Sequence, residues 1–313
     1  MNSIEVRNLT KRFGNFVSVD NISFNVSQGE IFGFLGANGA GKSTTIRMLC
    51  GILEPSSGDA LVGGFSIKNE PDKVKTQIGY MSQKFSLYND LTVEENINFF
   101  GGVYGLYNKK LQERKSWVLK VANLAGQEKT LTASLPGGIK QRLALCTAVI
   151  HEPKIVFLDE PTSGVDPISR RNFWDLINEL SSQGITVFVT THYLEEAEFC
   201  NNIILINAGK LIAEGNSKQL KTNYLTSTIL EIECEKVVTA MELLEKENFV
   251  DEVSIFGNNM HIAVNNKFTS DQQIRDILSN RNNILIKRID KIIPTLEDVF
   301  IHLLEKDTKK DDK

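Results

Sequence analysis

The chain has 313 residues, 41% of them hydrophobic and 24% charged, which is enough for one large domain with a sizeable core and a smaller second domain. A formal charge of −4 argues against a general nucleic-acid binder, and the longest apolar runs are far shorter than the roughly 20 residues of a membrane span. The absence of an apolar segment after Met1 and the wide spacing of the four cysteines indicate a protein of the reducing cell interior with free thiols.

Two stretches near the start alternate apolar and polar residues, as half-buried antiparallel strands do. They cover residues 4–9 and 16–26, and the turn between them carries Phe13. The ring face of Phe13 can stack on a nucleotide base, which favours nucleotides without choosing strongly between bases. A single aromatic residue is about as often part of the core, so both interpretations stay open here.

A glycine-rich turn joins a short apolar run to a helix expected from about Lys42. Between Gly36 and Ser43 it matches G-x-x-x-x-G-K-[ST]. Its glycines permit positive φ and close approach, so that backbone N–H groups and the positive end of the helix can hold phosphate oxygens. An ordinary glycine turn is the alternative, which the strand before and the helix after disfavour. The predicted nucleotide contacts in this loop are Gly36, Ala37, Asn38, Gly39, Ala40, Gly41, Lys42, Ser43 and Thr44.

Within this loop Lys42 is expected to reach the terminal phosphates and the Ser43 hydroxyl to bind Mg²⁺. Further on, a short strand over residues 77–83 ends on Gln83, whose amide is free to reach a metal or a water. A glutamine at a strand end carries no information by itself, so this assignment depends on the other motifs.

From about residue 91 to 125 the pattern becomes helical, and Thr92 and Glu95 have the spacing of a capping box. We interpret this stretch as a mainly helical insertion in an α/β frame. Two adjacent glycines, Gly137 and Gly138, then open another expected helix. Their N–H groups and the helix dipole predict a second anion site, distinct from the first because no strand leads into it.

Two acids, Asp159 and Glu160, follow a buried strand that begins near residue 154. Because Mg²⁺ takes one or two carboxylates plus phosphate oxygens, we expect Asp159 to bind the metal and Glu160 to orient a water. Solvated acids at a strand end are the alternative, and the phosphate loop disfavours it. The next buried strand, residues 185–191, ends on His192. A lone histidine is usually structural, but at the carboxyl end of a sheet strand a γ-phosphate contact is favoured.

From about residue 226 the pattern changes, and its first six elements follow the βαββαβ order of a ferredoxin-like unit. No catalytic constellation is present in this stretch, so we interpret it as regulatory or dimerising. The mixed-charge residues 306–313 are expected to form a disordered tail.

Across roughly residues 2–220 the chain resembles the ATP-binding subunit of an ABC transporter, and the order and spacing of the motifs are highly specific. A weaker resemblance links residues 294–300 to the C-terminal extension of ABC-2 type drug and polysaccharide exporter subunits. The matching motifs are Walker A at residues 36–43, the Q-loop glutamine Gln83, the signature at residues 135–139, Walker B at residues 155–159 with the catalytic glutamate Glu160, the D-loop at residues 163–166 ending on Asp166, and the switch histidine His192.

The resemblance implies an α/β fold, namely a P-loop NTPase ABC-ATPase cassette over residues 1–222. It would have a RecA-like core, an antiparallel β subdomain and a helical subdomain at about residues 84–138. A small α+β ferredoxin-like C-terminal domain over residues 223–305 would follow.

The resemblance also implies a dimer with a second ATP-binding cassette, either identical or related. Each ATP and its Mg²⁺ would lie between the Walker motifs of one subunit and Gly137, Gly138 and the D-loop Asp166 of the other. Closure would drive export through a separate transmembrane permease subunit, whose coupling helix the helical insertion receives. The chain would then be peripheral on the cytoplasmic face of the cell membrane, with no nucleic acid as partner.

Hydrolysis would follow the logic of phosphoryl transfer, with Lys42 and Mg²⁺ neutralising charge, Glu160 polarising the attacking water and His192 holding the γ-phosphate. The implied metal ligands are Ser43, Gln83 and Asp159. Two other classes compete with this interpretation. Soluble ABC ATPases that act on ribosomes or DNA resemble tandem or coiled-coil-split cassettes, whereas this chain has one cassette and no sustained heptads. A P-loop small-molecule kinase would leave the signature stretch and His192 without a role.

One residue departs from the family pattern. Pro136 stands where members usually have a serine whose hydroxyl meets the partner's γ-phosphate, and proline offers neither hydroxyl nor N–H. Proline suits the start of a helix, so the two following glycines can still present their N–H groups. We hypothesise that the ATP sandwich forms but holds ATP less tightly, and unchanged affinity and turnover in Pro136→Ser would contradict this.

Overall fold

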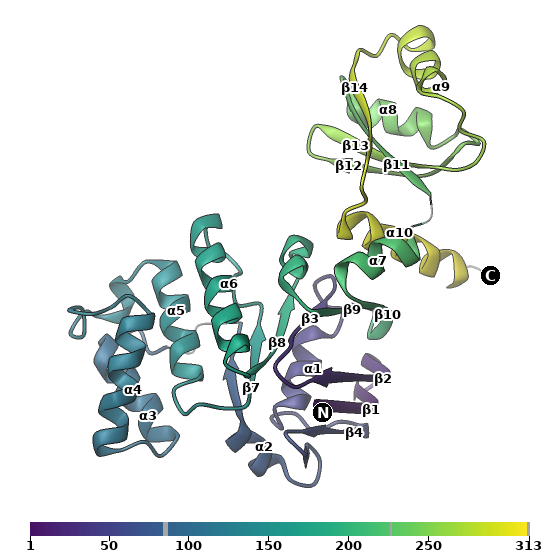
Figure 1. Cartoon of the computed structure of the whole chain (residues 1–313). Coiled ribbons are helices and arrows are strands. Elements are labelled where there is room, and N and C mark those ends of the chain that lie inside the picture. Colours follow the sequence, from purple (N-terminus) through teal and green to yellow (C-terminus); the bar gives the residue numbers. More distant parts are fainter. Residues whose placement is uncertain (84–86, 226, 312–313) are drawn as a thin grey trace. The chain divides into compact units, whose positions relative to one another are not determined.

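The computed structural model describes residues 1–83, 87–225 and 227–311 (Figure 1). The chain divides into two compact units, Met1–Glu214 and Gly215–Lys313. This division lies a few residues before the domain boundary expected at residues 222/223. Helix α7 (Ser217–Tyr224) contacts helix α10 (Leu296–Asp311), which places α7 in the second unit.

The first unit contains a six-stranded sheet whose five strands from β9 to β6 run parallel. Every residue of strands β3, β8 and β7, which are neighbours in this sheet, is buried, as is typical of parallel strands covered on both faces. In spatial order the strands are β10 (Lys210–Gly215), β9 (Asn202–Asn207), β3 (Ile31–Leu35), β8 (Thr186–Thr191), β7 (Ile155–Asp159) and β6 (Ile78–Met81).

A second sheet in this unit has the order β2-β1-β4-β5, and its neighbouring strands pair antiparallel. It provides the antiparallel part of the expected cassette fold. Its strands are β1 (Asn2–Phe13), β2 (Phe16–Ser27), β4 (Ser57–Val62) and β5 (Phe65–Ser66).

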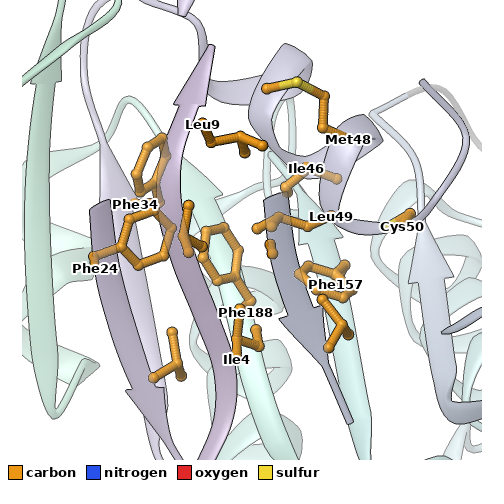
Figure 2. Close-up of a cluster of buried hydrophobic side chains, with 14 of the residues drawn as sticks. Ile4, Leu9, Phe24, Phe34, Ile46, Met48, Leu49, Cys50, Phe157 and Phe188 are labelled. Carbon is orange, nitrogen blue, oxygen red and sulfur yellow. The ribbon is translucent and has the colours of Figure 1, made fainter. Parts of the chain in front are cut away.

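A cluster of buried apolar side chains joins the two sheets to helix α1 (Lys42–Leu49) (Figure 2). Phe188 of β8 is fully buried, and its ring centroid lies 5.4 Å from those of Phe32 and Phe157 and 5.5 Å from that of Phe34. Phe24 of β2 stacks on Phe32 at 5.6 Å. This cluster therefore fixes the strands that carry the candidate site in one rigid arrangement.

The expected capping box is confirmed at the start of helix α3 (Val93–Val103). There the Thr92 side chain accepts from Glu95 N, and the Glu95 side chain accepts from Thr92 N. The stretch expected as a helical insertion contains α3, α4 and the short 3₁₀ helix η1, while residues 84–86 lie outside the described residues. The helices of this unit after α1 are α2 (Pro71–Gln77), α3 (Val93–Val103), α4 (Asn108–Val121), η1 (Thr132–Ser134), α5 (Gly137–Ala148), α6 (Pro167–Ser182) and the 3₁₀ helix η2 (Leu194–Phe199).

The second unit contains a four-stranded antiparallel sheet with the order β12-β13-β11-β14. Strand β13 lies between β11 and β12, which are joined through α8, so the predicted ferredoxin-like arrangement is confirmed. After α7 its elements are β11 (Thr228–Cys234), α8 (Val237–Leu244), β12 (Val250–Phe256), β13 (Asn259–Val264), α9 (Asp271–Arg275), the π-helix η3 (Asp276–Arg281), β14 (Ile286–Ile292) and α10.

Helix α10 continues past residue 305 to Asp311, through most of the segment for which a disordered tail is expected. Residues 312 and 313 lie outside the described residues. None of the described helices combines the length and apolarity needed to cross a membrane. Each of the four cysteines is a buried free thiol, as the sequence predicts.

Candidate functional site

The sheet register brings three predicted motifs to one edge. Leu35 at the end of β3 pairs with Thr191 at the end of β8, and Asp159 at the end of β7 pairs with Thr190. The residues that follow these strands are the first loop glycine, Glu160 and His192. Because the three strands are parallel neighbours, their carboxyl ends form one site, as open α/β sheets commonly do.

The backbone of the glycine-rich loop requires glycine at positions 36, 39 and 41, the same glycines that the phosphate-loop prediction uses. Gly39 and Gly41 have φ values of 82° and 106°, which side-chain-bearing residues rarely adopt. A Cβ added at Gly36 would lie 2.2 Å from the Ile206 carbonyl oxygen, and one at Gly41 would lie 2.5 Å from that of Ser18. The backbone can therefore curl tightly at the start of α1, whose positive end favours anions.

Lys42 lies almost fully buried at the mouth of this loop. Its ammonium donates to the carbonyls of Gly36 and Ala37 at 2.9 and 3.1 Å and lies 3.1 Å from Glu160 Oε1. A buried ammonium needs such partners, because an unpaired charge is costly to remove from water. The loop thus holds one cation against the neighbouring strand end.

Three other predicted residues meet at the Glu160 carboxylate. Besides the ion pair with Lys42, its second oxygen Oε2 accepts from Gln83 Nε2 at 2.9 Å and lies 3.3 Å from His192 Nδ1. The backbone of Glu160 has a φ of 47°, and its N–H donates to the Thr190 carbonyl at 3.1 Å. A strained backbone held by the next strand is common at functional sites.

Asp159 is buried beside this group. Its Oδ1 accepts from Ser43 Oγ at 3.0 Å and from Thr190 Oγ1 at 2.8 Å. Burial raises the pKa of Asp159, and the hydrogen bonds from Thr190 and Ser43 act in the opposite direction. A cation beside this carboxylate would favour its ionised form.

The oxygens of Ser43 and Asp159 fit Mg²⁺. This ion prefers oxygen ligands and is usually bound by one or two carboxylates together with phosphate oxygens. Ser43 and Asp159 supply a hydroxyl and a carboxylate oxygen that already lie together. In the described ranges no group of three or more His, Cys, Asp and Glu side chains gathers that could hold a metal alone. Oxygens of a ligand would therefore have to complete the coordination shell.

A pocket of about 470 Å³ opens over the loop, within the size range of cofactor sites. Phe13 and Phe16, which pair across the tip of the β1–β2 hairpin, are both exposed at its wall. Lys11 Nζ lies 5.3 Å from the centroid of the Phe13 ring. The lining residues are Phe13, Phe16, Ser18, Asn38, Gly39, Gly41, Lys42, Ser43, Thr44, Gln83 and Glu160.

Three contributors to the site do not follow from the motifs. Phe16 lines the pocket, Ser18 donates to Thr44 Oγ1 at 2.9 Å, and Thr190 bonds Asp159. A sequence signal exists only for Phe16, a second aromatic residue on the other side of the turn that carries Phe13. The other two are hydroxyls in strands and look ordinary in the sequence.

Among the predicted loop contacts, Gly36, Ala37 and Ala40 do not line the pocket but shape the loop around it. Ala40 N donates to the Ala37 carbonyl at 3.2 Å, and Gly209 N donates to the Ala40 carbonyl at 3.0 Å. These residues are therefore part of the loop's support in this structure.

The residues of the second expected anion site lie outside this pocket. Gly137 begins α5 and is exposed, and a Cβ added there would meet nothing within 4 Å. A Cβ at Gly138 would lie 2.3 Å from Ser169 Oγ, so this glycine is required by packing. Pro136 precedes the helix as its N-cap residue.

Asp166 has a structural role that the motif analysis does not predict. Its Oδ1 accepts from Ile168 N at 3.1 Å and from Ser169 N at 2.9 Å, which caps helix α6. The hydrogen bonds from Ser169, followed by that from Ile168, lower the pKa of Asp166. A nucleotide contact of Asp166 stays a prediction.

Two family descriptions match the chain. That of the ABC transporter family matches residues 19–163, and that of the ATP-binding protein DrrA1-3-like, C-terminal domain matches residues 215–304. The chain is 33% identical over 305 residues to the linearmycin resistance ATP-binding protein LnrL of Bacillus subtilis (strain 168), which covers 96% of this chain and 97% of LnrL. It is also 33% identical over 310 residues to the Nod factor export ATP-binding protein I of Rhizobium sp. (strain N33), covering 98% of this chain and 99% of that protein.

A higher identity, 53% over 218 residues, links the chain to the probable multidrug ABC transporter ATP-binding protein YbhF of Escherichia coli (strain K12). This match covers 70% of the chain but only 38% of YbhF. The chain thus spans well under half the length of that relative.

Solved structures of ATP-binding cassettes resemble the chain in fold. One described as the ATP-binding subunit of an ABC transporter has a TM-score of 0.64 at 27% identity, covering 71% of this chain and 92% of that one. A dimeric ATP-binding cassette in a post-hydrolysis state with ADP and Pi has a TM-score of 0.62 at 26% identity, covering 68% and 98%.

Proposed function

Because the chain belongs to the family of ABC transporter ATP-binding proteins, we propose that it binds ATP with Mg²⁺ and hydrolyses it to drive export through a separate membrane protein. The observation that carries this proposal is the convergence of Lys42, Gln83 and His192 on the Glu160 carboxylate at the wall of the pocket. The names of the relatives, which include resistance and export proteins, support the exporter class.

In this mechanism the loop N–H groups and Lys42 bind the β- and γ-phosphates, and Phe13 stacks on the base. Ser43, Gln83 and Asp159 would hold Mg²⁺, which supplies positive charge to the transferring phosphoryl group. Glu160 polarises the attacking water, and His192, 3.3 Å from Glu160, holds the γ-phosphate. Burial of the Lys42–Glu160 pair strengthens these electrostatic interactions, because little water screens them.

A second cassette, identical or related, completes the site in this proposal. The exposed start of α5 supports it, because Gly137 has open space where a side chain would stand. A glycine that the chain's own packing does not require is consistent with close approach by a ligand from outside. Gly137, Gly138 and Asp166 would then face the partner's nucleotide.

The membrane partner would dock on the helical insertion. Exposed aromatic side chains gather there, since Tyr88 and Phe99 are 50% and 42% exposed and their rings meet edge to face at 4.8 Å. Val103 and Tyr107, which lie near the end of α3, are also exposed. Such a patch suits the coupling helix of a permease and would place the chain at the inner face of the cell membrane.

The test is Glu160→Gln in the full-length chain. Gln keeps the size of the side chain but cannot act as a base, so we expect ATP binding to persist and turnover to fall by roughly 10²- to 10⁴-fold. Turnover and binding of labelled ATP are measured together, with Glu195→Gln, an exposed acid, as control. Undiminished hydrolysis would contradict the role of Glu160. Purification of the chain with ribosomes or DNA instead of a polytopic membrane protein would contradict the transport function.

A further inference from the structure

A buried carboxylate, Glu196 of η2, lies near the site but has no role in the mechanism above. Its side chain is 2% exposed. Its Oε1 accepts a hydrogen bond from Thr162 Oγ1 at 2.5 Å and lies 3.5 Å from Arg170 Nε. Its second oxygen has no hydrogen-bond partner among the described residues. A carboxyl group so deeply buried and only partly hydrogen-bonded is costly to remove from water.

Glu196 and its hydrogen-bond partner Thr162 belong to the two segments that carry the reactive groups. Thr162 lies two residues after Glu160, and Glu196 lies four residues after His192. The hydrogen bond between them therefore ties the segment following β7 to the segment following β8. The same two segments also meet where His192 Nδ1 lies 3.3 Å from Glu160 Oε2.

Arg170 extends this connection to the residue next to His192. The Arg170 guanidinium lies 4.2 Å from the centroid of the Tyr193 ring, and the Tyr193 ring centroid is 4.1 Å from that of His192. One buried carboxylate thus orients an arginine that packs on the aromatic neighbour of the histidine. Cation–π contacts of this kind strengthen when they are shielded from water.

We infer that Glu196 is a positioning residue for ATP hydrolysis. By holding Thr162 and Arg170 together, it keeps Glu160 and His192 within reach of each other, at the observed 3.3 Å. The inference rests on the proposed function, because it concerns the rate of the proposed hydrolysis. It differs from a purely structural role in one respect: a structural residue would change stability, whereas a positioning residue changes kcat in molecules that remain folded.

The experiment compares isosteric variants of the full-length chain. Glu196→Gln keeps an oxygen for Thr162 but removes the charge next to Arg170, and Thr162→Val removes the donor hydroxyl without changing the shape. We expect kcat to fall about tenfold in each, since small displacements of reacting groups have effects of this order or larger. KM for ATP and the affinity for labelled ATP should stay unchanged, because neither residue lines the nucleotide pocket.

Three controls separate the outcomes. Thr162→Ser keeps the hydroxyl and should retain the wild-type kcat, and Glu195→Gln alters an exposed neighbour and should have no effect. The double variant of Glu196→Gln with Thr162→Val should lose no more than the worse single variant, because both disrupt one connection.

A wild-type kcat in folded Thr162→Val or Glu196→Gln would overturn the inference, as would a raised KM with unchanged kcat. If Glu196→Gln fails to fold, the comparison of kcat between Thr162→Val and Thr162→Ser tests the inference by itself. Absence of turnover in the wild type would instead contradict the proposed function itself.

Discussion

At the scale of single residues, the site depends on backbone positions that only glycine tolerates. Gly41 combines a φ of 106° with a Cβ direction that points at the Ser18 carbonyl oxygen, only 2.5 Å away. Gly64 has a similar φ of 88°, but a Cβ added there would meet nothing within 4 Å. A side chain at Gly64 would therefore cost only backbone strain, whereas one at Gly41 would cost backbone strain and a steric clash.

We predict that Gly64→Ala lowers the free energy of unfolding by about 1–2 kcal/mol, the cost of placing a side chain in the left-handed region. Gly41→Ala should lower the free energy of unfolding by about 1–3 kcal/mol more, because strand β2, which carries Ser18, must also move to relieve the clash. Urea unfolding followed by tryptophan fluorescence measures both, since Trp117 and Trp174 lie in the same unit as these glycines. Equal costs for the two variants would contradict the steric argument.

At the scale of elements, a charged cluster ties helix α10 to the sheet of the second unit. His261 of β13 is buried, with Nδ1 2.8 Å from Asp298 Oδ1 and Nε2 3.5 Å from Glu231 Oε2. Asp298 Oδ2 also accepts from the backbone N–H of Thr295, and Arg288 pairs with Glu231. The start of α10 is thus held by one carboxylate that serves both helix and strand.

The pKa values of this pair are shifted in opposite directions. Burial lowers the pKa of His261, but the hydrogen bonds and charges of Asp298 and Glu231 outweigh it and raise that pKa overall. Burial raises the pKa of Asp298, but hydrogen bonds from His261 and Thr295 outweigh it and lower that pKa. The stabilisation from His261 is therefore fully present below about pH 6.5 and is lost as the pH rises through its raised pKa. That from Asp298 is lost only as the pH falls through its lowered value.

We predict that the second unit loses stability as the pH rises above about 6.5, and that Asp298→Asn removes most of this dependence. Asn retains an oxygen that can cap α10 but no charge to hold the proton on His261. NMR titration of the histidines in the full-length chain measures the change, and His151, whose pKa burial lowers to about 4, is an internal contrast. An unchanged His261 midpoint in Asp298→Asn would contradict the assigned pairing.

At the scale of the whole molecule, the proposed dimer depends on the exposed start of α5. Gly137 opens this helix with free space around its Cβ direction, whereas Gly138 is pressed against Ser169. Packing within the chain therefore accounts for the glycine at position 138 but not for the one at position 137.

We predict that Gly137→Glu abolishes ATP-driven dimerisation and turnover while leaving the melting temperature within a few degrees of the wild type. An acid near a helix N-terminus is favourable to the fold, but it would face the partner's triphosphate. Size-exclusion chromatography with ATP in the Glu160→Gln background measures the dimer. The matched control is Gly102→Glu, another helical glycine with open space. Normal dimerisation of Gly137→Glu would exclude this helix start from the interface.

The sequence by itself determined the features that depend on neighbouring residues. The phosphate loop follows from glycines and a lysine within a few positions, the capping box at Thr92 from a spacing of three residues, and the inner strands from apolar runs. The βαββαβ order of the second unit was predicted for the same reason. These signals are local, because backbone conformation and helix ends depend mainly on adjacent side chains.

Only the tertiary structure decided which distant residues meet. Ser43 and Asp159 are 116 positions apart, and Thr162 and Glu196 are 34 apart, so no local pattern links them. The contact of α7 with α10 likewise depends on helix packing between residues far apart in the sequence. The contacts of Ser43 with Asp159 and of Thr162 with Glu196 form when the parallel strands align their carboxyl ends around a shared apolar core, and that alignment is a property of the whole fold.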